Sequence, residues 1–328
     1  MVNAAGNQSY GSDVKIALEK VWGYMDHASG QRLTAGMDDM LTALMRYKEL
    51  DVTDAALALL HGLSPATADR LLRRIRERTG LKGKSTTKPG TLLKRNIPIR
   101  LGTEWEENKP GFVEIDLVAH CGDTASGDYL NTLDVTDIFT GWTETQTVIN
   151  KAQRHVFAAL RDIEGRLPFP LLGIDSDNGS EFINDELYRY CMGRGICFTR
   201  SRPYMKNDSC HVEQKNWHVV RRNIGYDRYE GQRALCIMNK YYELLRLFTN
   251  FFLPQTKLIG KSRDGAHVHK YYEIPKTPYQ RVLQTDSIPG ETKAKLNSIL
   301  ASLNPAQLKR DMLLLQDSLW QLGIPNGR

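Results

Sequence analysis

The first eighty residues carry a helical pattern of apolar and polar positions. Apolar residues recur every three or four positions, the spacing of one buried helix face, over residues 14–27, 37–50 and 53–61. Gly62 then closes the third segment. Ser64 followed by Pro65 is a typical start of a further helix, which we expect to reach Gly80. Two short helices joined by a tight glycine-containing turn predict a helix-turn-helix.

The last of these helices and the stretch after it are strongly basic. Eleven basic residues and one acid, Glu77, lie between Arg70 and Arg100, a density that favours phosphate contacts through counterion release. The alternative is a solvated basic helix in a small bundle. We expect residues 1–80 to bind DNA and residues 81–110 to form a basic linker along it. The candidate DNA contacts are Arg70, Arg73, Arg74, Arg76, Lys82, Lys84, Lys88, Lys94 and Arg95.

From residue 112 onward the pattern alternates between strand and helix periods. The expected strands are residues 112–119, 129–135, 142–148, 171–176 and 196–199. The expected helices are residues 151–165, 183–193 and a segment from Asn207 to about Arg222. A meander of three strands followed by helix, strand, helix, strand and helix implies an α/β fold with a mixed sheet and helices on both faces.

The last hundred residues, 230–328, are expected to be mainly helical. We predict an apolar helix over 239–252, a basic and tyrosine-rich irregular stretch over 257–281, and a helical end over 291–322. The irregular stretch interleaves basic residues with tyrosines, so it either binds nucleic acid or is a polar linker. The apolar face of the tail packs on the core or on another subunit.

Composition narrows the class of protein. The chain has 328 residues, of which 41% are hydrophobic, enough for two or three folded units. Its net charge of +6 is a weak indication of a polyanionic partner. Five cysteines without a CxxC pair argue against a disulfide framework and a structural zinc site. Neither a signal pattern nor a long apolar run is found, so we expect a cytoplasmic protein without a membrane span.

Three acids stand out as a candidate metal site. Asp116 lies within an apolar strand, where a carboxylate is costly unless it is paired or binds a cation. Asp177 follows another apolar strand, and Glu213 lies near the start of a helix. Such carboxylates suit hard divalent cations, which serve phosphodiester chemistry. On the residues alone, turn or surface roles remain open, and Glu114 and Asp175 are rivals on the same strand faces.

Short motifs around these acids resemble the DDE transposases of the retroviral-integrase superfamily. The segment Asp177-Asn178-Gly179-Ser180-Glu181-Phe182 is similar to that around the family's second catalytic Asp. The segment His211-Val212-Glu213-Gln214-Lys215-Asn216 is similar to the one that carries its Glu. Between Asp177 and Glu213 lie 35 residues, the family's spacing. Residues 114–116 resemble the first strand. The resemblance covers residues 111–229 and is closest to bacterial insertion-sequence transposases with an integrase catalytic core.

The resemblance implies a ribonuclease-H-like, five-stranded core over residues 111–229. It also implies Asp116, Asp177 and Glu213 as catalytic residues that hold two Mg²⁺ or Mn²⁺ ions, and it selects Asp116 over Glu114 and Asp177 over Asp175. The His/Cys zinc module of retroviral integrases has no counterpart in this sequence. The helix-turn-helix candidate would therefore recognise DNA ends in its place.

Other polar residues near the acids are secondary candidates. Asn178 is expected to shape the turn after Asp177. His211 either touches the site or lies on the helix surface. Lys215 and Arg221 are candidates for phosphate contacts. The loop residues Arg202 and Lys206 either position DNA or are solvated. Trp142 and Trp217 are expected in the core.

The expected function is metal-dependent 3′-end hydrolysis and strand transfer during transposition. Its partners would be double-stranded element ends and target DNA, on which a homo-oligomer would assemble. Two alternatives stay open. One is a nuclease of the same fold that stops at hydrolysis, and the other is a domesticated relative that binds DNA without cutting it.

Overall fold

The chain forms two compact units whose segments alternate along the sequence. In this computed structural model, the residues described are 10–78, 109–176, 179, 181–182, 184–200, 216–264 and 267–325. Unit 1 consists of Met1–Lys84, Phe252–Thr277 and Ala301–Lys309, and unit 2 of Ser85–Phe251, Pro278–Leu300 and Arg310–Arg328. Two stretches of the expected C-terminal region therefore belong with the N-terminal helices.

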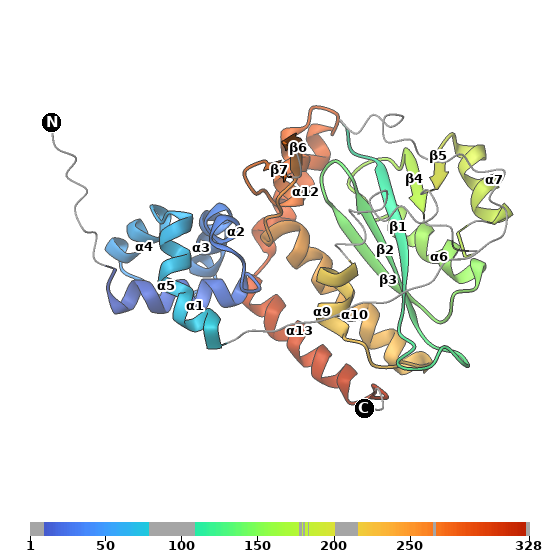
Figure 1. The fold of residues 1–328 in the computed structure, drawn as a ribbon, viewed down its shortest axis with the longest axis horizontal. Helices are drawn as coiled ribbons and strands as arrows, with labels where there is room; N and C mark the ends of the chain where they lie inside the picture. Colours follow the sequence, from blue (N-terminus) through green and yellow to red (C-terminus); the bar gives the residue numbers. More distant parts are fainter. Residues whose placement is uncertain are drawn as a thin grey trace. The chain divides into compact units, whose positions relative to one another are not determined.

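The N-terminal part of unit 1 is helical. Its described residues form α1 (Ser12–Tyr24), α2 (Gly30–Ala35), α3 (Met37–Arg46), α4 (Asp54–His61) and α5 (Pro65–Arg78), drawn in blue in Figure 1. Apolar spacing predicted four of them, whereas α2 is too short to show a period. The hydroxyls of Thr53 and Ser64 accept from backbone N–H groups at 3.2 Å and cap α4 and α5.

The later segments of unit 1 are fastened to these helices by side chains. Arg32 of α2 donates from Nε to the carbonyl of Pro254 at 2.7 Å, although the two are 222 positions apart. The amide of Asn304 donates to Glu49 Oε1 at 2.9 Å, and Lys309 pairs with Asp26. Arg46 donates to the carbonyl of Ala301 at 3.0 Å. The helical unit is thus completed by chain far downstream.

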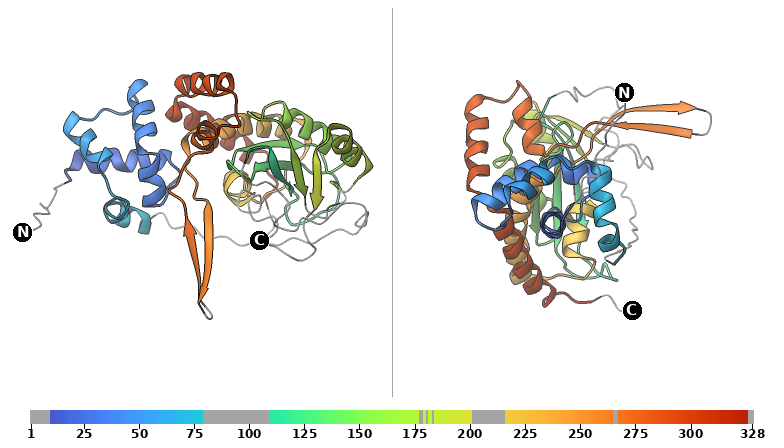
Figure 2. Two further views of the ribbon diagram at one scale, coloured as in Figure 1. Left: turned by 90° about the horizontal axis from the view of Figure 1, so that it is seen from above. Right: turned by 90° about the vertical axis from the view of Figure 1, so that its left-hand side faces the viewer.

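Unit 1 also carries a β-hairpin, where the sequence predicted an irregular stretch. Strands β6 (Leu258–Asp264) and β7 (His267–Tyr272) pair antiparallel as a two-stranded sheet, drawn in orange in Figure 2. The prediction of irregular structure over 257–281 was therefore wrong. Gly260 and mixed polar residues interrupt the alternation that reveals strands, while cross-strand pairing supplies the missing order. The end of that stretch enters α11 (Pro278–Gln284).

The described part of unit 2 contains a five-stranded mixed sheet in the order β3-β2-β1-β4-β5, visible in green in Figure 1. The strands and intervening helices are β1 (Phe112–Ala119), β2 (Asn131–Asp137), β3 (Thr143–Val148), α6 (Gln153–Glu164), β4 (Gly173–Ser176), α7 (Asp185–Arg194) and β5 (Cys197–Arg200). Strands β1 to β3 run antiparallel, and β4 and β5 run parallel to β1. The α/β, ribonuclease-H-like prediction is confirmed.

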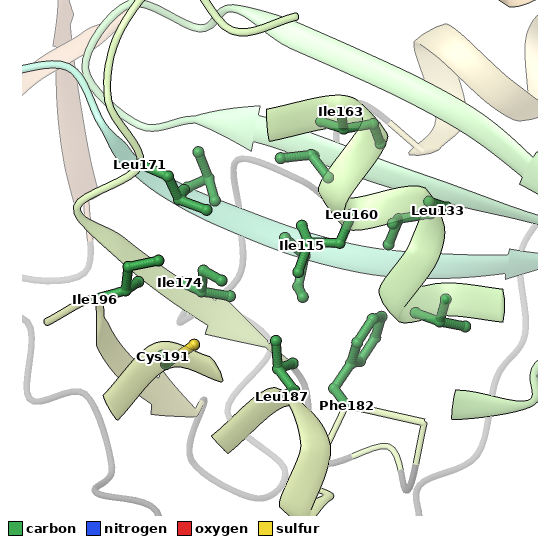
Figure 3. Close-up of a cluster of buried hydrophobic side chains, with 14 of the residues drawn as sticks. Ile115, Leu133, Leu160, Ile163, Leu171, Ile174, Phe182, Leu187, Cys191 and Ile196 are labelled. Carbon is green, nitrogen blue, oxygen red and sulfur yellow. The ribbon is translucent and has the colours of Figure 1, made fainter. Parts of the chain in front are cut away.

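The two faces of this sheet differ in chemistry. One face packs on α6 and α7 through a cluster of apolar side chains that includes Ile115, Leu133, Leu160 and Ile174 (Figure 3). Because side chains alternate along a strand, Asp116 lies on the other face, away from this cluster. Polar residues populate that second face, and its buried members include Glu114, His120, Thr132, Asp134 and Asp175.

The helix α10 (Gly231–Phe252) covers the edge strand β3 with two asparagines. The amide of Asn250 accepts from the backbone N–H of Thr143 at 3.0 Å and donates to its carbonyl at 2.8 Å. Asn239 makes the same pair of bonds with Thr147, at 2.7 and 3.2 Å. Both backbone groups of these edge residues are thereby satisfied, which protects an edge that would otherwise pair with other strands.

The C-terminal region is mainly helical, as predicted. Its remaining helices are α12 (Gly290–Ser302) and α13 (Pro305–Trp320). The chain end is held on unit 2, where Arg228 and Ile324 exchange backbone hydrogen bonds at 3.0 and 2.9 Å. Among the described helices, none combines the length and the apolar character that a membrane crossing requires.

Candidate active site

Asp116 lies in the middle of the central strand β1, and its carboxylate is held from two directions. Asp116 Oδ1 accepts from the backbone N–H of Leu117 at 2.8 Å. Its other oxygen accepts from the side-chain amide of Asn216, the first residue of the π-helix η1 (Asn216–Arg221). Asp134 is the residue directly opposite on β2. A strand from one part of the unit and a helix from another therefore meet at this carboxylate.

Burial and the neighbouring groups shift the pKa of Asp116 in opposite directions. Burial raises the pKa of its carboxyl, and the nearby carboxylate of Glu181 raises it further. The hydrogen bonds from Leu117 and Asn216 and the charge of Arg221 lower it, without cancelling the effect of burial. A cation bound beside this carboxyl would favour its ionised form.

Arg221, at the end of η1, supplies part of that positive charge while serving a structural role. Its guanidinium donates to the carbonyl of Ala119 at 2.9 Å and lies over the ring of Tyr226 at 5.0 Å. Burial lowers the pKa of Arg221, and the charge of Asp116 acts in the opposite direction. These contacts hold the partly buried guanidinium on β1.

The register between β1 and β4 relates Asp116 to Asp177, the second candidate acid, through the sequence that follows each strand pair. Ile115 of β1 pairs with Ser176, the last residue of the parallel strand β4. Asp116 and Asp177 are the next residues in sequence after this pair. Asp177 itself, Glu213, and the secondary candidates Asn178, His211, Lys215, Arg202 and Lys206 lie outside the described residues. Among the residues that are described, no cluster of three His, Cys, Asp or Glu side chains forms a metal site.

The two rival acids are interior residues of the sheet. Glu114 and Asp175 are paired in the β1–β4 register and are at most 1% exposed. The hydroxyl of Thr199 donates to Asp175 at 2.5 Å, so this carboxylate is engaged within the sheet.

Several polar residues near Asp116 were not predicted from the sequence. Asn216 and Glu181 both fall inside the motifs that carry the family resemblance, so their positions were visible but their contacts were not. His120, which directly follows the end of β1 and lies four positions after Asp116, is buried, and its Nε2 lies 2.8 Å from the hydroxyl of Thr132. Burial lowers the pKa of His120 to about 3, which keeps the ring neutral.

On α5 the predicted arginines fall into two groups. Arg70, Arg73 and Arg74 are exposed, and the first two line a hollow of about 510 Å³ together with Asp69, Arg76 and Glu77. Arg76 instead pairs with Asp69 at 2.5 Å, donates to the carbonyl of Ala28 at 2.8 Å and lies over Trp22. The other basic candidates, Lys82, Lys84, Lys88, Lys94 and Arg95, lie outside the described residues.

The two tryptophans expected in the core, Trp142 and Trp217, differ in their exposure to solvent. Trp142 is 2% exposed, as predicted, and its indole N–H donates to Glu144 at 2.9 Å. Trp217 is 43% exposed, so the prediction for it was wrong. Its helix begins beside Asp116, and the ring packs only edge-on against His218 among the contacts described.

The strand order and the connections of unit 2 define an integrase-core fold of the ribonuclease-H-like class. The chain is 39% identical over 274 residues to the protein named "Uncharacterized protein y4rM" of Sinorhizobium fredii (strain NBRC 101917 / NGR234), covering 83% of this chain and 78% of that one. It belongs to the same family as y4rM. No family model matches the sequence.

Solved structures that resemble the chain include retroviral integrase cores. The catalytic core domain of BIV integrase is 17% identical, covers 53% of this chain and 94% of its own, and has a TM-score of 0.34. The HTLV-2 integrase catalytic core domain in complex with magnesium is 15% identical over 44% of this chain and 90% of its own, with a TM-score of 0.34. A chain of the simian T-cell lymphotropic virus intasome, in complex with PP2A regulatory subunit B56 gamma, is 16% identical over 75% of each chain, with a TM-score of 0.38.

Proposed function

We propose that this protein is a DDE transposase or integrase that hydrolyses DNA 3′ ends and joins them to target DNA. The observation that carries the proposal is the contact between Asn216 and Asp116. It brings the start of η1 onto the central strand, and Glu213 precedes Asn216 by only three positions. The register of β1 and β4 likewise favours Asp177 as the neighbour of Asp116.

The donor set fits a hard divalent cation. Asp116 is a desolvated carboxylate with a raised pKa, and its described donors, Leu117 and Asn216, are neutral. Oxygen ligands of this type suit Mg²⁺ or Mn²⁺. Asp116, Asp177 and Glu213 would hold the ions, two per site. When bound, such ions lower the pKa of the attacking water or hydroxyl and stabilise the leaving oxygen.

The protein's own residues then have separate roles. Asn216 orients Asp116, because an amide that donates to one carboxylate oxygen fixes the direction of the other. Arg221 offsets part of the cost of a partly buried anion on β1. Asn178, His211, Lys215, Arg202 and Lys206 would adjust the site or position the phosphate backbone.

Unit 1 would recognise the element ends. The exposed arginines Arg70, Arg73 and Arg74 on α5 favour phosphate or groove contacts in a helix-turn-helix arrangement. The basic stretch with Lys82, Lys84, Lys88, Lys94 and Arg95 would extend the contact along DNA. Because two ends must be joined, the active form would be a homo-oligomer on DNA.

The test is a joining assay with supercoiled plasmid and labelled duplexes that carry candidate element ends, with Mg²⁺ or Mn²⁺. We expect metal-dependent joining by the wild type, abolished by Asp116→Asn and by Asp177→Asn. The control is Asp123→Asn, which removes an exposed carboxylate of the same unit and should leave joining intact. Metal-dependent nicking without joining would instead support the nuclease alternative. Binding to verified ends with neither reaction would exclude catalysis.

A further inference from the structure

Within the described part of the chain, the strands β6 and β7 pair only with each other and not with the five-stranded sheet. Isolated two-stranded hairpins are at best marginally stable in water. Several of the hairpin's large apolar or aromatic side chains are exposed. Ile259 is 65% exposed, Tyr271 54% and Tyr272 53%. Such an arm is expected to gain stability from a partner that covers it.

The charge of the hairpin indicates the kind of partner. Residues 257–276 contain five lysines and arginines against two acids, together with two histidines. Lys261 and Lys270 are directly opposed in the strand register. Like charges at directly opposed positions destabilise a strand pair. A polyanion on the arm would offset this excess of positive charge.

The base of the hairpin is attached to the helical part of unit 1. Gln255 and Lys276 close the base by exchanging backbone hydrogen bonds at 2.8 and 3.2 Å. The adjoining Pro254 accepts the hydrogen bond from Arg32 of α2. Pro254 also packs so close to Gly36 that a Cβ there would lie 2.7 Å from its ring. The arm and the arginine-bearing helix α5 thus belong to one unit, although all five strands β1 to β5 lie between them in sequence.

We propose that the β6–β7 hairpin is a second DNA-binding element of unit 1, which inserts as a two-stranded ribbon into a groove of duplex DNA. A two-stranded ribbon fits the major groove in width. Its basic residues are accompanied by two adjacent tyrosines, Tyr271 and Tyr272, whose exposed rings would contact sugars and bases. The proposal deepens the proposed function: α5 and the hairpin together would make a bipartite contact with the element end.

A second copy of the chain is a poorer occupant. Pairing two hairpins edge to edge about a two-fold axis places the same surface on both sides. It would bring together two segments that each carry an excess of positive charge, which is unfavourable. Duplex DNA relieves that repulsion.

The test exploits the opposed lysines. Lys270→Glu places opposite charges at two directly opposed positions of the register, a change that favours a strand pair. If the arm binds DNA, the same change weakens binding. We expect the full-length variant to keep or raise its melting temperature. Its affinity for a labelled duplex should fall several-fold, and its salt dependence (the slope of log K against log salt) should decrease by about 1.

The matched control is Lys295→Glu, which makes the same charge change at an exposed lysine of α12 in unit 2 and should bind as the wild type does. Equal affinity and salt dependence for Lys270→Glu and the wild type would overturn the hairpin proposal alone. A change in oligomeric state without a change in DNA affinity would also overturn it, in favour of a second copy. Absence of DNA binding by the wild type would reject both this proposal and the proposed function. Joining lost in Asp177→Asn with the hairpin effect intact would support both.

Discussion

The side-chain amide of Asn216 donates to the carboxylate of Asp116, a residue 100 positions earlier in the chain. The bond links the central strand of the sheet to the first turn of η1. It provides one of two neutral donors to a carboxylate whose pKa is raised by burial. The orientation of the principal candidate acid therefore depends on the segment that immediately follows Glu213.

Removal of that donor should weaken the site without unfolding it. In Asn216→Ala, Asp116 keeps only the N–H of Leu117 among its described donors. We expect the joining rate to fall by about 10- to 100-fold, the usual effect of losing a residue that orients a metal ligand. The concentration of Mg²⁺ needed for half-maximal rate should rise. Steady-state rates against Mg²⁺ concentration measure both effects. An unchanged Mg²⁺ dependence would show that Asn216 does not orient a ligand.

Metal binding should appear as stability that depends on Asp116. A cation bound at one hundred times its Kd stabilises the folded state by about 2.7 kcal/mol. We expect Mg²⁺ to raise the melting temperature of the wild type but not that of Asp116→Asn. Asp123→Asn, in which an exposed carboxyl is changed, should respond as the wild type does. Equal shifts in all three proteins would place the binding elsewhere.

In EDTA, the effect of Asp116→Asn on the stability of the fold should depend on pH. The pKa of Asp116 is raised above 3.8 by burial, so the folded state holds its proton more tightly than the unfolded state. The cost of ionising this carboxyl is therefore absent below pH 3.8, grows as the pH rises, and is complete above the folded pKa. We expect Asp116→Asn to be more stable than the wild type at pH 8, with a smaller difference at pH 4. Melting temperatures at both pH values decide this.

His120 should make the fold sensitive to mild acid. Burial lowers the pKa of His120 from 6.5 to about 3. The stability that depends on the neutral ring is complete above pH 6.5 and is lost as the pH falls toward 3. The loss at pH 5 is about 2 kcal/mol, at 1.4 kcal/mol per pH unit. We expect His120→Gln to remove this component. A difference between the two unfolding free energies that stays constant from pH 7.5 to 5 would contradict the assignment.

Arg73 and Arg76 should give opposite phenotypes although they lie on the same helix. Arg76→Ala loses the pair with Asp69, the bond to the Ala28 carbonyl and the contact with Trp22, so unit 1 should lose about 1–3 kcal/mol. Arg73→Ala should leave stability unchanged and reduce the salt dependence of DNA binding by about 1. Urea unfolding and fluorescence anisotropy measure the two properties. If both variants are stable and bind equally, the division between them is wrong.

Asn239 and Asn250 of α10 should contribute unequally to the free energy of unfolding. Asn250 is completely buried, and its replacement by Ala leaves the N–H and carbonyl of Thr143 without these partners. We expect Asn250→Ala to cost about 2–4 kcal/mol. Asn239→Ala should cost less, because its bonds to Thr147 are only partly buried and water can replace the amide. Urea denaturation compares them, and equal losses would show that burial does not set the difference.

The sequence predicted most of the fold where a strong period was present. The limits of β1 were predicted correctly because Val113, Ile115 and Leu117 alternate with polar residues. The hairpin was missed because Gly260 and scattered charges hide its alternation. Trp217 was wrongly predicted to be buried because large aromatic residues on helices usually are. The spacing of apolar residues along a helix does not show which other elements pack against it. The contact of Asn216 with Asp116 depends on tertiary folding, which no local pattern encodes.

Unit 1 is assembled from three separated stretches of chain, and this affects how the protein is made. The N-terminal helices leave the ribosome early, but the segments that complete their unit, Phe252–Thr277 and Ala301–Lys309, follow only after all five strands β1 to β5. At about 5–20 residues per second, the wait is tens of seconds. A nascent chain or an early-terminated product therefore lacks the finished unit 1. Under the proposed function, competence to engage DNA would arise only after the sheet that carries Asp116 has been made, so shorter products would not occupy DNA ends unproductively.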